Sequence, residues 1–82
     1  MIVRVKLFAV ARQRVGRDEV EVKRTTASMS VRELREALVE EFPALREVMP
    51  HIRVAVNSEY SSDASLIPEG AETALIPPVS GG

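Results

Sequence analysis

The sequence closes on Pro77-Pro78-Val79-Ser80-Gly81-Gly82, a segment whose residue types suit chemistry at the end of a chain. The two prolines hold φ at about −65° and favour an extended path, so six residues can reach about 20 Å. Gly81 and Gly82 have no Cβ and can pass through a channel that a larger residue would obstruct. We therefore expect the α-carboxylate of Gly82 to be a reactive group that is delivered into another protein's active site.

A carboxylate is a poor acyl donor at neutral pH, so this group needs activation, most simply as an acyl-adenylate made from ATP. Both the activation and the later transfer need a second protein that encloses the glycine. We expect this chain to bind no cofactor itself, with ATP used by the activating partner enzyme. The alternative interpretation is an incidental tail, because chain termini are usually disordered and tolerate change.

The composition argues against several other kinds of function. There is no cysteine, which excludes disulfides, thiolate metal sites and a cysteine nucleophile, and the single histidine, His51, is expected on a surface turn. A formal net charge of −1 provides no strong field for nucleic acid or membranes, and no apolar run approaches the roughly 20 residues that span a bilayer. Since no acid–base cluster is apparent, we expect a non-catalytic cytoplasmic protein with no nucleic-acid or membrane partner.

The rest of the chain must form the domain that holds this tail, and we expect a boundary between residues 1–76 and residues 77–82. A hydrophobic content of 45% is enough for one small core. Alternation of apolar and polar residues predicts the first three strands, a proline pair ends the last one, and good helix formers before Gly16 predict a short helix. The predicted strands are residues 2–8, 18–23, 52–56 and 73–76; the short helix is 9–15, and 57–65 is predicted to be a loop.

The strongest local pattern is an amphipathic helix over residues 30–42. Ser30 and Glu33 have the spacing of a capping box, Met29 and Leu34 can form a hydrophobic staple, and Pro43 ends the pattern. The order of elements predicts an α+β fold, a mixed sheet of four to five strands covered on one face by one main helix. If the last strand pairs with the first, the tail projects from one end of the sheet.

Four segments carry a resemblance to a known family: VRVKLFAVARQRVG, SMSVRELREAL, IRVAVN and EGAETALIPPVSGG. The PPVSGG end is the most specific of them. The sequence resembles the small sulfur-carrier subunits of molybdopterin synthase, which belong to the ubiquitin-like β-grasp family. The resemblance implies a β-grasp fold with a flexible C-terminal diglycine tail.

The resemblance also implies a sulfur-carrier cycle in molybdenum cofactor biosynthesis. An adenylating, E1-like enzyme would activate Gly82 with ATP, and a sulfur donor acting through that system would convert it to a thiocarboxylate. The tail would then enter the large catalytic subunit of the synthase, in a heterotetramer with two of each chain, and pass sulfur to a pterin precursor. Gly81 would permit threading, and the path would be set by Pro77, Pro78, Val79 and Ser80.

The family uses an apolar patch near the last strand for docking, which points to Leu75 and Ile76. Phe8 is a candidate neighbour on the first strand, because it is out of phase with the apolar face of that strand. Core packing is the alternative for Leu75 and Ile76, since every strand must bury one face.

Three other functions stay open at this point. The chain could be a thiamine-pathway sulfur carrier, although the helix over residues 9–15 and the PPV segment favour the molybdopterin branch. It could be a ubiquitin-like modifier whose Gly82 joins a lysine amine. It could also be a β-grasp interaction module without tail chemistry, which would tolerate an added residue after Gly82.

Overall fold

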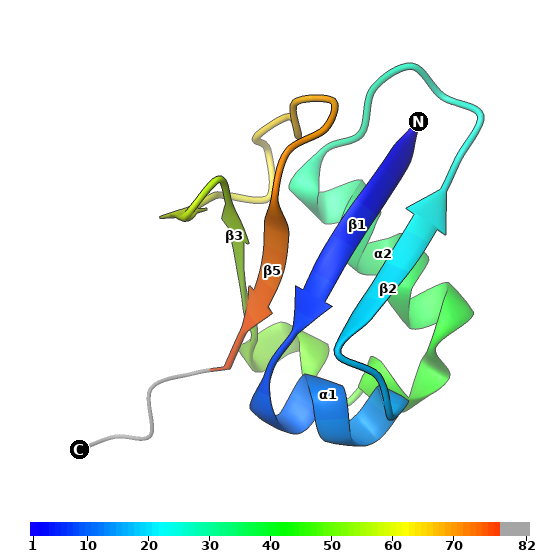
Figure 1. The fold of residues 1–82 in the computed structure, drawn as a ribbon, viewed down its shortest axis with the longest axis vertical. Helices are drawn as coiled ribbons and strands as arrows, with labels where there is room; N and C mark the ends of the chain where they lie inside the picture. Colours follow the sequence, from blue (N-terminus) through cyan, green and yellow to red (C-terminus); the bar gives the residue numbers. More distant parts are fainter. Residues whose placement is uncertain (78–82) are drawn as a thin grey trace.

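The computed structural model describes residues 1–77, and Figure 1 shows their arrangement. The chain has two helices and five strands: the helices follow the first and second strands, and two short 3-10 turns lie between the second helix and the third strand. The elements are β1 (Ile2–Leu7), α1 (Ala9–Val15), β2 (Glu19–Lys23), α2 (Val31–Glu41), the 3-10 turns Pro43–Leu45 and Met49–His51, β3 (Arg53–Val56), β4 (Glu59–Tyr60) and β5 (Thr73–Ile76).

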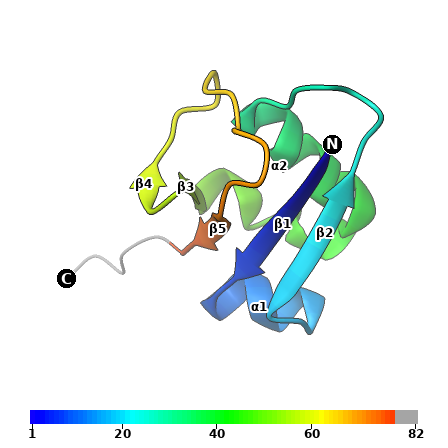
Figure 2. The same ribbon diagram turned by 45° about the horizontal axis from the view of Figure 1, so that its top comes forward.

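The five strands form one mixed sheet in the order β2-β1-β5-β3-β4. β1 and β5 run parallel, whereas the β1–β2, β3–β5 and β3–β4 pairs are antiparallel. The last strand therefore pairs with the first and lies in the middle of the sheet. Helix α2 packs across one face only (Figures 1 and 2), which confirms the predicted two-layer α+β architecture and gives the β-grasp arrangement.

Local sequence signals determine where both helices begin and end. Gly16 adopts the left-handed conformation (φ 82°) and donates its N–H to the Arg12 carbonyl, which closes α1 as predicted. At the start of α2, the Ser30 hydroxyl accepts a hydrogen bond from the Glu33 N–H at 3.1 Å, and the Glu33 carboxylate accepts one from the Ser30 N–H at 3.0 Å. This is the predicted capping box.

Strand β4 lies within the segment that was predicted to be a loop, so that prediction was wrong for Glu59 and Tyr60. Asn57 and Ser58 both have positive φ (51° and 69°) and form a two-residue turn, because Val56 pairs directly with Glu59. The strand has two residues, both exposed, so it has no apolar alternation that a sequence pattern could detect.

The core lies between the inner face of the sheet and α2. It is built from alternate strand residues and from one stripe of the helix, mostly valine and leucine. The side chains that are buried most completely include Val5, Leu7, Val22, Val31, Leu34, Leu38, Val54 and Leu75. Because strand side chains alternate between faces, the residues between them point away from α2 and form the outer face of the sheet.

Thr73 is the one polar residue of the core among the described residues. Its side chain is 0% exposed, and its hydroxyl has no hydrogen-bond partner in residues 1–77. A buried hydroxyl without a partner costs about 1–3 kcal/mol. Thr73→Val keeps the β-branched shape, so we expect it to raise the free energy of unfolding by about 1 kcal/mol in equilibrium urea denaturation.

The matched control is Thr25→Val, which makes the same change at an exposed position. We expect this control to change the free energy of unfolding by less than about 0.5 kcal/mol. Destabilisation by Thr73→Val would show that the hydroxyl makes a favourable interaction in the folded protein.

Candidate docking face

The predicted tail follows the central strand of the sheet. Pro77 comes directly after Ile76 at the end of β5 and is half-buried. β5 and β1 run parallel, so their C-terminal ends lie at the same end of the sheet (Figure 1). Phe8 follows β1 at this end. The predicted tail residues Pro78, Val79, Ser80, Gly81 and Gly82 lie outside the described residues.

The outer face of the sheet has a hollow near this end of β1 and β5. Lys6 pairs with Ala74, Ala74 pairs with Ala55, and Ala55 pairs with Tyr60, so one row of side chains crosses four strands. The two alanines in the middle leave a hollow of about 300 Å³. It is lined by Lys6, Phe8, Ala55, Ser58, Tyr60, Glu72, Ala74 and Ile76, a set that we call the outer hollow.

Two exposed aromatic rings border the outer hollow, and cationic side chains lie at its rim. Phe8 is 44% exposed and Tyr60 is 58% exposed. The Arg53 guanidinium lies 5.0 Å from the centroid of the Tyr60 ring, and Lys6 Nζ is 3.1 Å from a carboxylate oxygen of Glu72. Exposed aromatic residues around a small-residue centre with basic groups at the rim fit a partner that offers apolar and acidic side chains.

The structure corrects one predicted docking residue. Leu75 is 0% exposed and belongs to the core, because Thr73 and Leu75 point inward while Ala74 and Ile76 point outward. Of the predicted docking residues, Phe8 and Ile76 therefore line the outer hollow and Leu75 does not. Leu75 acts on the docking face indirectly, by holding β5 in the sheet.

Sequence reasoning missed six of the eight residues that line the outer hollow, among them Ala55, Tyr60 and Ala74. Their grouping follows from the pairing of β3 with β4 and β5, which is a long-range property. Tyr60 offered a weak signal, as one of the three aromatic residues of the chain, in a segment without apolar alternation.

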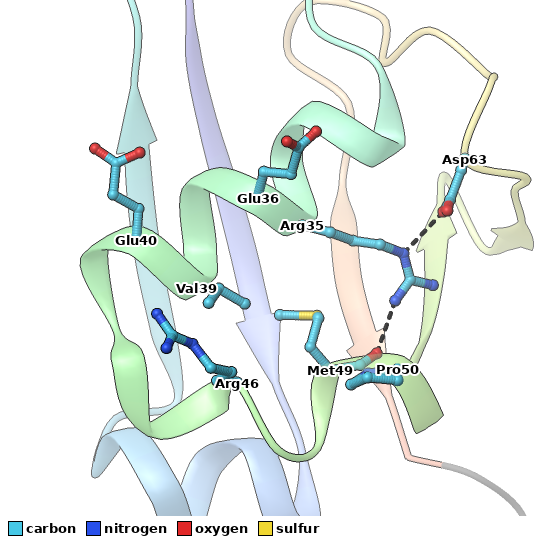
Figure 3. Close-up of a pocket in the computed structure, with 8 residues that line it drawn as sticks. All are labelled: Arg35, Glu36, Val39, Glu40, Arg46, Met49, Pro50 and Asp63. Carbon is cyan, nitrogen blue, oxygen red and sulfur yellow. Dashed lines mark hydrogen bonds and ion pairs between the residues drawn. The ribbon is translucent and has the colours of Figure 1, made fainter.

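A second hollow lies on the helical side of the molecule, where Arg35 is held in place (Figure 3). Its Nε donates to a carboxylate oxygen of Asp63 at 2.9 Å, and its Nη1 donates to the Met49 carbonyl at 2.9 Å. These bonds tie α2 to the 3-10 turn and to the loop after β4. Nε and Nη1 of Arg35 are thus used within the fold, so we interpret the role of this side chain as structural.

The remaining candidates add no reactive cluster. His51 is exposed at the end of a 3-10 turn, as predicted. Residues 1–77 contain no group of three side chains able to hold a metal ion, and none of their helices is long and apolar enough to cross a membrane.

Comparisons of the sequence and the structure with known proteins show the family of this chain. A family model described as the ThiS family matches residues 5–82. The chain belongs to the ThiS family. Its curated relatives include the molybdopterin synthase sulfur carrier subunit of Arabidopsis thaliana, 39% identical over 80 residues that cover 98% of this chain and 82% of that protein. The subunit of the same name from Caenorhabditis briggsae is 37% identical over 82 residues, which cover 98% of this chain and 96% of that protein.

Solved structures of similar proteins cover nearly the full length of this ThiS-family chain. SAMP1 of Haloferax volcanii is 33% identical, with a TM-score of 0.84 and complete coverage of both chains. A putative molybdopterin converting factor subunit 1 from Pyrococcus furiosus is 29% identical, with a TM-score of 0.83 and coverage of 95% and 98%. A chain in the complex of subunits 1 and 2 of the Helicobacter pylori molybdopterin-converting factor is 25% identical, with a TM-score of 0.69 and complete coverage of both chains. The resemblance stated from the sequence and the predicted β-grasp fold are both confirmed.

Proposed function

We propose that this chain is the sulfur-carrier subunit of a molybdopterin synthase and that Gly82 carries the sulfur as a thiocarboxylate. The main observation behind this proposal is that β5, the central strand, ends beside the outer hollow. A tail that starts there has a rigid base, and this base is next to the surface that a partner would bind. Relatives named as sulfur carrier subunits, which match this chain almost end to end, support the same function.

The proposed loading reaction takes place on the main chain of Gly82. A carboxylate oxygen attacks the α-phosphate of ATP in an E1-like activating enzyme, and pyrophosphate leaves. Sulfide released by a sulfur donor acting through that system then attacks the carbonyl carbon and displaces AMP, and loss of its proton leaves a thiocarboxylate. This chain needs no cysteine for either step because the sulfur is bound to its terminal carbonyl carbon, and it contains none.

The proposed acceptor is the large catalytic subunit, which would bind the outer hollow and receive the tail. The similar chain from Helicobacter pylori was solved as a complex of subunits 1 and 2 of a molybdopterin-converting factor, which supports such a partner. Pro77, Pro78, Val79 and Ser80 would set the path of the tail, and Gly81 would pass the narrowest point. In the last step the sulfur is transferred from Gly82 to a pterin precursor. The proposed complex is a cytoplasmic heterotetramer with two small and two large subunits.

The docking step gives a direct test at Phe8. Truncation of an exposed aromatic anchor in an interface costs about 1–3 kcal/mol, so we expect Phe8→Ala to weaken binding to the large subunit by roughly 10- to 100-fold. Isothermal titration calorimetry with the purified large subunit measures this change. The matched control is Leu66→Ala, which truncates an apolar side chain that is 65% exposed and does not line the outer hollow. Equal affinities for the two variants would place the interface elsewhere.

A second candidate function is protein modification, in which Gly82 would form an isopeptide bond with a lysine amine of another protein. The likeness to SAMP1, a small archaeal modifier protein, favours it. Both functions need the same activated glycine, and they differ in the acceptor. Mass spectrometry of proteins from cells that produce the chain distinguishes them: glycine-linked lysines on other proteins indicate modification, and sulfur transfer to a pterin indicates the carrier.

A further inference from the structure

Strand β2 lies at one end of the strand order and pairs only with β1 within the described residues. Met1 and Arg24 exchange both backbone hydrogen bonds, at 2.6 and 3.0 Å, and the Leu7 N–H donates to the Asp18 carbonyl at 2.8 Å. The even-numbered residues of β2 therefore direct their backbone groups at β1. In an antiparallel ladder the direction alternates, so the N–H and C=O groups of residues 19, 21 and 23 point to the free edge.

One backbone group of this free edge already has a partner, because the Lys23 carbonyl accepts a hydrogen bond from Arg24 Nη1 at 2.8 Å. Beside the edge lies a hollow of about 470 Å³, lined by Arg17, Glu19, Val20, Glu21, Lys23 and Phe42. The strand contains no proline, and its pairing with β1 is continuous over all five residues, without a bulge. An edge of this kind offers a row of unpaired donors and acceptors to another strand. Phe42, half-buried beside it, is apolar surface that such a strand would cover.

The charges on the edge match a second copy of the same strand. Antiparallel pairing around a two-fold axis at Glu21 places Glu19 of each copy opposite Lys23 of the other copy. The dimer therefore contains two such pairs of opposite charge. The three facing pairs all consist of residues whose backbone groups point outward, so each pair can form two hydrogen bonds, about six in total. Two of these six use the Lys23 carbonyl, which Arg24 Nη1 contacts in the single chain and would have to share or release. Glu21 faces its own copy, but each of these carboxylates is held by Arg4, whose Nε lies 3.1 Å from Glu21 Oε2.

We propose that two copies of this chain associate through β2 of each and form one continuous sheet. On the inner face of that sheet Val20 lies opposite Val22 of the other copy, which extends both cores across the junction. β1 separates β2 from β5, so the association leaves the end of β5 and the outer hollow accessible. The inference uses only the sheet edge and does not depend on the function of Gly82.

Sedimentation velocity of the full chain over a range of concentrations tests this association. We expect the dimer mass at high protein concentration and the monomer mass on dilution. Amide hydrogen exchange adds a reading at single residues: the amides of Glu19, Glu21 and Lys23 should exchange more slowly as concentration rises. Those of Val20 and Val22 should not change, because they already bond to β1. A monomer mass at every concentration would overturn the proposal.

Two variants test the register. Lys23→Glu places like charges opposite each other twice, and we expect the dimer dissociation constant to rise about tenfold. The exchange of both charges, Glu19→Lys with Lys23→Glu, should restore the dissociation constant to within about threefold of the original. Glu21→Pro removes an N–H that β1 does not use, so the ladder with β1 stays complete while the dimer is lost. A dimer that neither Lys23→Glu nor Glu21→Pro weakens would overturn the proposal.

Discussion

One alanine added after Gly82 is expected to lower sulfur transfer by more than 100-fold in a reaction reconstituted with the activating enzyme, the sulfur donor and the large subunit. The addition moves the terminal carboxylate by about 3.5 Å and adds a Cβ to a chain end that must pass through a narrow channel. A displacement of about 1 Å can already cost 100-fold when reacting groups must be aligned. The measurement is the amount of pterin product formed per carrier chain.

The control for this prediction is Leu66→Ala, which changes an exposed residue outside the tail segment and the outer hollow and keeps the length of the chain. We expect the control to retain activity within about threefold, since it leaves the position of the carboxylate unchanged. The intact mass of the extended chain is recorded before and after the reaction, so that trimming of the added residue is detected. Full activity of an untrimmed extended chain would show that Gly82 is not the reactive group.

Leu75→Ala is expected to lower the free energy of unfolding by about 2–5 kcal/mol, because Leu75 is completely buried in the central strand. Small domains have a total stability of about 5–15 kcal/mol, so this single truncation removes a large part of it. Equilibrium urea denaturation measures the loss as a lower transition midpoint with a similar slope.

The neighbouring residue provides the contrast for this prediction. Ile76→Ala truncates a side chain on the opposite face of the same strand, which is only half-buried and lines the outer hollow. We expect it to destabilise the domain by less than about 1.5 kcal/mol and to weaken binding to the large subunit. The assignment of Leu75 to the core would be wrong if Leu75→Ala kept full stability and lost affinity for the large subunit.

These two residues also show what the sequence could and could not predict. Residues 73–76 were predicted to form a strand, but the face that turns inward depends on pairing with β1 and β3 and on the position of α2. In this strand the inward residues are Thr73 and Leu75, so a polar residue is buried while Ile76 is partly exposed. Hydropathy alone would place Thr73 on the outer face of the sheet. Its burial is set by the long-range pairing register of β5 with β1 and β3.

Features set by neighbours in the sequence were predicted well. The capping box of Ser30 and Glu33, the end of α1 at Gly16 and the exposure of Phe8 each depend on a few adjacent residues, and the structure confirms all three. The outer hollow was predicted only in part, because Ala55 and Ala74 become neighbours through the pairing of β3 with β5. The roles of residues 78–82 remain predictions from the residue types of the tail and from the family resemblance.

Intact-mass analysis of the chain after co-expression with its activating enzyme and a sulfur donor tests the central claim most directly. The account predicts replacement of one oxygen atom by sulfur, located at Gly82 by fragmentation, and no such replacement in the chain extended by alanine. An unaltered Gly82 carboxylate in the presence of an enzyme that adenylates the chain, or sulfur attached at any other residue, would contradict it.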